Sequence, residues 1–116
     1  MKFLVIMSET DHYDRWAELT DADRADVFAA FERYEAAVAE RGQLLGGEGL
    51  AHPTEARTLR PGTGDGRPVT EGPYAETAEQ IGGFFLVELP DLDAAVSTAR
   101  LLPEAFSIEV RPVVPG

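Results

Sequence analysis

The sequence predicts one α+β domain over residues 1–116, in which two helices cover one face of a four-stranded antiparallel sheet. Short apolar runs alternate with two amphipathic stretches in the order strand, helix, strand, strand, helix, strand. Hydrophobic residues make up 44% and charged residues 27% of the chain, which is typical of a globular protein with a single core. The turn-rich residues 54–71 interrupt the order and predict an inserted β-hairpin.

The first strand is expected at residues 2–8, where a continuous apolar run with β-branched members suits burial on both faces. This run is too short for a signal-peptide core or a membrane span, so we expect a cytoplasmic location. Residues 8–20 are polar and predict a loop or a short turn. This segment carries His12 among other aromatic and ionisable side chains.

A long helix is predicted over residues 21–41, because apolar side chains recur there at spacings of four, three and four residues. Thr20 or Asp21 is the expected N-cap, and Gly42 is the expected stop. One face of the helix therefore belongs to the core. The residues of this apolar stripe are Val27, Phe31, Tyr34 and Val38.

The middle of the chain predicts a second strand and then the hairpin. The second strand is expected at residues 43–50, where glycines allow close backbone approach or positive φ around Glu48. Residues 54–60 and 67–71 alternate weakly around a Pro-, Asp- and Gly-rich loop, which is typical of a β-hairpin. We expect this hairpin to be an excursion from the main sheet.

The last three elements are predicted by apolar patterning and by their end signals. Residues 81–89 form the strongest strand pattern. Asp91 is a good N-cap for a second helix over residues 92–102, and Pro103 closes it. Residues 107–111 alternate polar and apolar side chains, as a half-buried strand does.

This order of elements is that of a ferredoxin-like βαββαβ sandwich with an inserted β-hairpin. The sheet face away from the helices would expose apolar side chains, since Phe84 and Phe85 point to opposite faces. A homodimer that stacks two such sheets is the simplest cover. We expect an aspartate at Phe84 or Phe85, whichever faces the partner, to break the dimer before it unfolds the protomer.

The charge balance excludes several partners and sites. Ten basic and twenty-one acidic residues give a net charge of −11, which disfavours direct binding to nucleic acid or to anionic membranes. The chain has no cysteine, so disulfides and thiolate sites are excluded. His12 and His52 have no second ligand at metal spacing, and the glycine runs lack the features of a phosphate loop. We therefore expect no metal and no cofactor.

Residues 71–80 are the expected ligand site. A Gly-Pro turn fixes Glu71 and Tyr74, and one helical turn after it would align the polar side chains at 76, 79 and 80. We expect them to line a cleft with Glu71 or Glu76 partly buried; the alternative is that these carboxylates cap turns and stay solvated. The candidate ligand-binding residues are Glu48, Glu71, Tyr74, Glu76, Glu79, Gln80 and Arg111.

Three landmarks in the sequence support a resemblance to a known family. They are Glu71-Gly72-Pro73-Tyr74-Ala75-Glu76 leading to Gly82-Gly83-Phe84, then Gly46-Gly47-Glu48, and finally Glu109-Val110-Arg111-Pro112. With them the chain resembles the YCII-related, or DGPF-domain, family of small bacterial proteins. The resemblance implies a ferredoxin-like fold, dimerisation as a dimeric α/β barrel and a cleft beside the sheet.

The chain departs from the family pattern at two places. The Asp-Gly-Pro-Phe motif is Glu-Gly-Pro-Tyr here, which keeps the carboxylate and the aromatic ring. In the YCII branch a helical histidine acts with an aspartate, and by spacing back from Leu44-Leu45 the corresponding place looks like Phe31 here. A His–Asp mechanism therefore does not transfer to this chain by the resemblance alone.

Two functions are consistent with these features. One is a non-catalytic small-molecule-binding or accessory protein; the resemblance links it to genes for alternative sigma factors and so to transcription regulation. The other is a cofactor-independent enzyme that uses acid–base chemistry, with Glu71, Glu76 or His12 as candidate catalytic residues. The sequence slightly favours the first. A reaction rate that follows the titration of a carboxylate would indicate the second.

Overall fold

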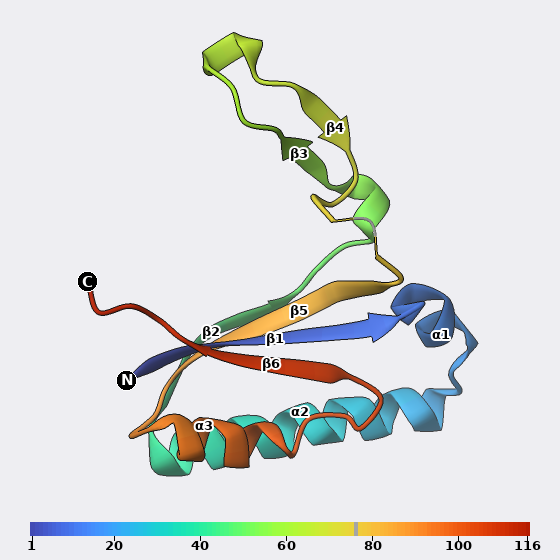
Figure 1. Cartoon of the computed structure of the whole chain (residues 1–116). Coiled ribbons are helices and arrows are strands. Elements are labelled where there is room, and N and C mark those ends of the chain that lie inside the picture. Colours follow the sequence, from blue (N-terminus) through green and yellow to red (C-terminus); the bar gives the residue numbers. More distant parts are fainter. Residues whose placement is uncertain (76) are drawn as a thin grey trace.

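A computed structural model of the chain describes residues 1–75 and 77–116, and in it four strands form one antiparallel sheet while two form a separate hairpin (Figure 1). Three α-helices accompany them, and short 3-10 turns lie at Pro53–Glu55 and Gly64–Gly66. The helices and strands, in chain order, are β1 (Lys2–Thr10), α1 (His12–Glu18), α2 (Asp21–Arg41), β2 (Gln43–Gly49), β3 (Arg57–Leu59), β4 (Val69–Glu71), β5 (Glu79–Glu88), α3 (Leu92–Ala99) and β6 (Ser107–Pro112).

The main sheet has the strand order β2-β5-β1-β6, and every neighbouring pair is antiparallel. Figure 1 shows α2 and α3 against one face of this sheet, and the β3–β4 hairpin extending away from it on the other side. We call this hairpin, residues 56–72, the arm. The predicted α+β fold with an inserted hairpin is confirmed. The described residues of one chain do not close into a barrel.

The prediction of a loop over residues 8–20 is wrong. Strand β1 continues to Thr10, and α1 begins at His12 after Asp11 takes a left-handed backbone conformation with φ of 53°. Aspartate adopts a positive φ more readily than most residues, so one such residue lets the chain pass directly from a strand into a helix. Turning there brings His12 back over the end of the sheet.

The helix N-caps agree with the prediction, and some boundaries do not. Thr20 caps α2 in a capping box, because its Oγ1 accepts from Asp23 N at 3.1 Å while Thr20 N donates to Asp23 Oδ2 at 3.3 Å. Asp91 Oδ1 accepts from Ala94 N at 2.8 Å and caps α3. The second helix was predicted over 92–102, yet α3 ends at Ala99 and continues as turns.

The helical turn predicted within residues 76–80 is also wrong. Glu79 and Gln80 belong to β5, where they pair with Thr10 and Glu9 of β1. Neighbouring strand residues point to opposite faces, so these two side chains do not share a face. Glu76 lies outside the described residues.

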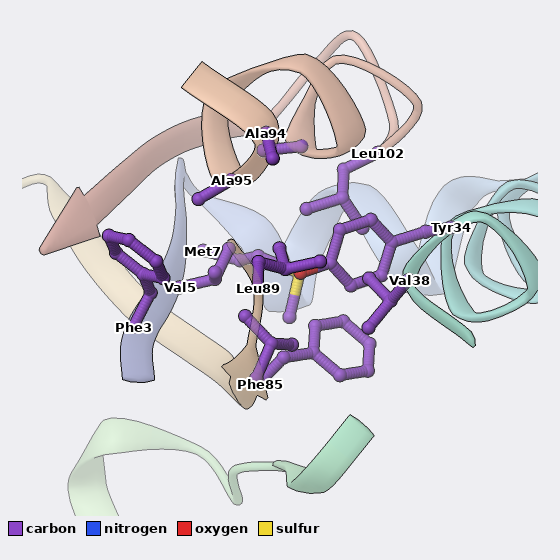
Figure 2. Close-up of a cluster of buried hydrophobic side chains, with 12 residues drawn as sticks. Phe3, Val5, Met7, Tyr34, Val38, Phe85, Leu89, Ala94, Ala95 and Leu102 are labelled. Atoms are coloured by element: carbon purple, nitrogen blue, oxygen red, sulfur yellow. The ribbon is translucent and has the colours of Figure 1, made fainter. Parts of the chain in front are cut away.

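The core lies between the sheet and the helices α2 and α3 (Figure 2). Pairing of Phe3 with Val87 and of Val5 with Phe85 directs these side chains toward α2 and α3. Ile6 and Phe84, which are adjacent in sequence to Val5 and Phe85, also pair with each other. Because successive strand residues point to opposite faces, these two side chains lie on the other face of the sheet, where both are only partly buried. The buried cluster consists of Phe3, Val5, Met7, Tyr34, Val38, Phe85, Val87, Leu89, Ala94, Ala95, Ala99 and Leu102.

Tyr34 is fully buried in this core, and its hydroxyl has no hydrogen-bond partner among the described residues. We expect Tyr34→Phe to raise the free energy of unfolding by about 1 kcal/mol at pH 7, because it removes an unpaired polar group and keeps the ring. Denaturant unfolding monitored by circular dichroism measures this change.

The same substitution has a predicted pH signature. Burial raises the pKa of Tyr34 to about 12, whereas the unfolded chain ionises near its ordinary value of about 10. The wild type therefore loses stability as pH rises from about 10 to 12, and Tyr34→Phe lacks this loss. A wild type and variant that lose stability in parallel over this range would contradict the assignment.

Candidate functional site

A cavity that we call the larger cavity lies beside the core, between the sheet and the helices α1 and α2. It has a volume of about 430 Å³ and combines residues from β1, α1, α2, β2 and β5. Volumes of ~300–1,000 Å³ with mostly apolar walls are typical of small-molecule sites. The aromatic side chains in its lining are Tyr13, Trp16, Phe28, Phe31, Phe85 and Phe106.

A buried acidic side chain is paired with a histidine in the wall of this cavity. Glu9 is 8% exposed, and its Oε2 lies 3.0 Å from Nδ1 of His12. An ionised carboxylate only accepts hydrogen bonds, so the neutral imidazole carries its proton on Nδ1 and has an acceptor lone pair on Nε2. Arg15 lies 3.7 Å from the other oxygen of Glu9, with a largely exposed side chain.

The position of the His12 ring depends on Gly82 in β5. A Cβ atom on Gly82 would lie 3.1 Å from Cδ2 and 3.4 Å from Nε2 of His12. The ring also packs edge-on against Phe106, with centroids 5.5 Å apart. The imidazole is thus held between the sheet backbone, an aromatic ring and the carboxylate of Glu9.

Tyr13 fixes α1 to the segment that follows β2. Its hydroxyl donates to the carbonyl oxygens of Leu50 at 2.5 Å and Ala51 at 2.8 Å. Burial, and then the negative charge of Glu55, raise the pKa of Tyr13 above its ordinary value, so this donor keeps its proton. Tyr13 therefore stabilises the side of the cavity formed by α1.

Trp16 and Phe28 form the outer aromatic wall. The Trp16 ring packs edge-to-face on Phe28 with centroids 5.6 Å apart. Arg24 of α2 donates from Nη2 to the Trp16 carbonyl at 2.8 Å and to the Ala17 carbonyl at 3.2 Å. Its guanidinium carbon also lies 5.6 Å from the Trp16 ring centroid. Arg24 thus holds the end of α1, and with it Trp16, against α2.

A smaller cavity of about 210 Å³ also borders the Glu9–His12 pair. Glu9, His12 and Tyr13 line both cavities, and the smaller one also contacts His52 and Gln80. The two histidines, which lie far apart in the sequence, thus border one space. Over residues 1–75 and 77–116, no three His, Asp or Glu side chains form a group that could hold a metal ion.

The predicted ligand segment lies mostly on the surface. Glu71 is exposed in β4 of the arm. The prediction was that Glu71 or Glu76 is partly buried, and Glu76 lies outside the described residues, so for Glu76 it stays a prediction. Tyr74 is 75% exposed. The Glu79 carboxylate accepts a hydrogen bond from Ser8 at 3.1 Å, and Gln80 Nε2 donates to the Thr77 carbonyl at 2.6 Å. The structure does not gather these side chains in one cleft.

Glu48 and Arg111, the two other candidates, lie apart from each other. Glu48 is exposed and contributes to the lining of the larger cavity, but its register opposite Phe84 directs its side chain to the sheet face away from α2. Arg111 pairs with Glu109 at 2.5 Å at the exposed edge strand β6. A binding role for either residue stays a prediction.

Glu9 is the residue that the sequence analysis missed. A signal was present, because Glu9 continues the alternation of Phe3, Val5 and Met7 and so falls on the core-facing side of β1. An acidic residue at a core-facing position is costly unless it is paired. Phe31, where the family resemblance implies a histidine, lines the same cavity as His12.

Comparison with known proteins gives two findings. A family model described as the YCII-related domain matches residues 1–115. An uncharacterized protein of Rhizobium meliloti (strain 1021) is 42% identical over 78 residues, which is 64% of this chain. The alignment spans 62% of that relative's own length. Separately, no helix in the described stretches combines the length and apolarity needed to cross a membrane.

Proposed function

This chain belongs to the YCII-related domain family, and we propose that its larger cavity binds a small molecule and moves a proton on it by acid–base chemistry. The observation that carries this proposal is the hydrogen bond between the buried Glu9 and His12 in the cavity wall, at 3.0 Å. In the proposal, His12 is the proton carrier and Glu9 is the positioning residue.

The proposed step needs only these two side chains. Nε2 of His12 takes a proton from an O–H or C–H bond of the substrate, and the electron pair of that bond stays on the substrate. Glu9 stabilises the imidazolium that forms, as the carboxylate does in other His–carboxylate pairs. The proton then returns to another atom of the substrate or to solvent, so the chemistry is an isomerisation or an exchange without a cofactor.

A non-catalytic role is the second candidate, and the arm favours it. Leu59 and Val69 on the arm are 53% and 60% exposed, although both are apolar. Exposed apolar side chains on a projecting hairpin suit contact with another protein. In this reading the cavity binds a ligand that regulates such a contact, in line with the expected link to alternative sigma factors.

We also infer a homodimer of the ferredoxin-like, dimeric α/β barrel type. The supporting observation is the sheet face opposite α2 and α3, where Ile6 and Phe84 pair across strands and remain partly exposed. Ile81 on the same face is 43% exposed. Stacking two such faces would remove this apolar surface from water.

The test of the proton-transfer proposal is an exchange experiment. Small cyclic and open-chain ketones are incubated with the protein in D2O, and loss of their α-proton signals is followed by ¹H NMR. We expect His12→Gln to slow the exchange by ~10²-fold or more, the contribution typical of a positioned acid–base group. Glu9→Gln is expected to slow it less, because it keeps a hydrogen-bond acceptor for Nδ1.

Glu40→Gln, an exposed change at the end of α2, is the matched control and should exchange like the wild type. A compound that binds in the cavity but exchanges equally fast with wild type and His12→Gln would overturn the proposal in favour of the non-catalytic role. If Glu71→Gln abolishes exchange and Glu9→Gln does not, the proton-transfer site lies on the arm and not in the larger cavity.

A further inference from the structure

The charged residues that line the larger cavity are all acidic. The charged residues in its lining are Glu9, Glu35 and Glu48, of which Glu48 directs its side chain to the other face of the sheet. No lysine or arginine of the described chain lines the cavity. Arg15 approaches Glu9 but does not line the cavity, and Arg24 is engaged with the Trp16 carbonyl. A carboxylate or phosphate ligand would meet repulsion here without a cation to balance it.

The walls of the cavity favour a flat ring. Phe31 lies at the centre of an aromatic chain, with its centroid 6.5 Å from Phe28, 6.1 Å from Phe85 and 6.3 Å from Phe106. Trp16 extends the chain beyond Phe28. Aromatic walls in edge-to-face or tilted contact stabilise a planar guest by stacking and edge contacts, which a puckered ring makes less well.

The polar side of the cavity suits one hydroxyl or carbonyl group. Glu9 occupies Nδ1 of His12, so Nε2 is the nitrogen that remains for a ligand. Because residue 82 is a glycine, no side chain lies between the backbone of β5 and this nitrogen. A hydroxyl can donate to Nε2 of the neutral ring, and a carbonyl can accept from it when the ring is protonated.

We propose that the cavity binds a neutral planar ring with a hydroxyl or carbonyl substituent, such as a phenol or a cyclic enone, and rejects anionic rings. This inference rests on the proposed function for the role of His12. The lining charges and the aromatic walls support the proposed class of ligand whether or not the protein is an enzyme.

The single tryptophan of the chain, Trp16, supplies the probe. Uniformly ¹⁵N-labelled protein gives one indole N–H signal, and its shift is followed during titration with phenol, cyclohexanol and benzoate at pH 7. Cyclohexanol keeps the hydroxyl and loses planarity, whereas benzoate keeps the ring and adds a negative charge. We expect phenol to bind about tenfold more tightly than either.

Two variants locate the binding. Phe28→Leu removes a ring that is already 54% exposed, so the fold should survive, and it should weaken phenol binding severalfold. Leu101→Ala, an exposed apolar change in the turn after α3, is the control and should leave it unchanged. Equal or tighter binding of benzoate, or no saturable shift with phenol, would overturn the ligand class.

These outcomes are separable from those of the exchange experiment. If phenol binds as expected but no ketone exchanges faster with wild type than with His12→Gln, the ligand class stands and the proton-transfer proposal fails. If exchange depends on His12 and the best substrate is an anion, the proton-transfer proposal stands and the ligand class fails.

Discussion

Phe84→Asp is expected to turn the proposed dimer into a folded monomer. Phe84 lies on the sheet face away from the helices, opposite Ile6, so an aspartate there leaves the core of the protomer intact. In the dimer the same carboxylate would be buried against a second apolar sheet without a partner. We expect dimerisation to weaken by a hundredfold or more, the size of a central interface residue worth about 3 kcal/mol.

Sedimentation velocity at micromolar concentration measures the oligomeric state, and circular dichroism checks the fold. Phe84→Leu is the matched control and should remain dimeric, because it keeps an apolar side chain. Phe85→Asp places the same charge on the core side, where Phe85 is 8% exposed, and should unfold the protein instead. A wild type that sediments as a monomer, or a Phe84→Asp variant that stays dimeric, would count against this interface.

Gly82→Val is expected to give the largest loss of function of any substitution outside the Glu9–His12 pair. Even a single Cβ at this position would lie 3.1 Å from the imidazole, so the branched side chain of valine must displace the ring. A displacement of ~1 Å in a reacting group can cost about a hundredfold in rate. We expect a loss of this order in α-proton exchange, with the strand itself preserved because valine favours β-structure.

The displacement has a direct spectroscopic readout. The chain has two histidines, so the ring signals of His12 are assigned by comparison with a His52→Gln variant. Gly82→Val should shift the His12 signals, and Gly82→Ala should do so less. Gly66→Val on the arm, where a Cβ would meet nothing within 4 Å, is the control. Unchanged His12 signals and unchanged exchange in Gly82→Val would exclude Gly82 as the support of the ring.

The regular elements other than α1 could be predicted from the sequence because they depend on local patterns. The apolar stripe that ends at Val38 defined α2, and the caps at Thr20 and Asp91 were correctly placed. The insertion of the hairpin followed from its turn residues. Such signals involve side chains within a few positions of one another, and they need no knowledge of what lies across the sheet.

The ligand segment shows where local signals fail. The spacing of Glu79 and Gln80 suits a helical turn, yet both are drawn into β5 by pairing with the end of β1. A ladder of backbone hydrogen bonds to a distant strand outweighs a weak local preference. The sequence alone therefore placed the candidate site on the conspicuous turn at Gly72-Pro73, which the structure puts at the base of the arm.

The sequence by itself determined the order of the sheet strands, the hairpin and the helices α2 and α3, together with the caps of these two helices and the acidic charge, because each depends on residue types and short spacings. Only the tertiary structure decided that Glu9, His12 and Gly82 meet. Glu9 and Gly82 are more than seventy positions apart in the numbering and are joined by the β1–β5 pairing. The left-handed turn at Asp11 then folds His12 back onto Glu9. Contacts of this kind depend on strand register and on one backbone angle, and neither is encoded in a local pattern.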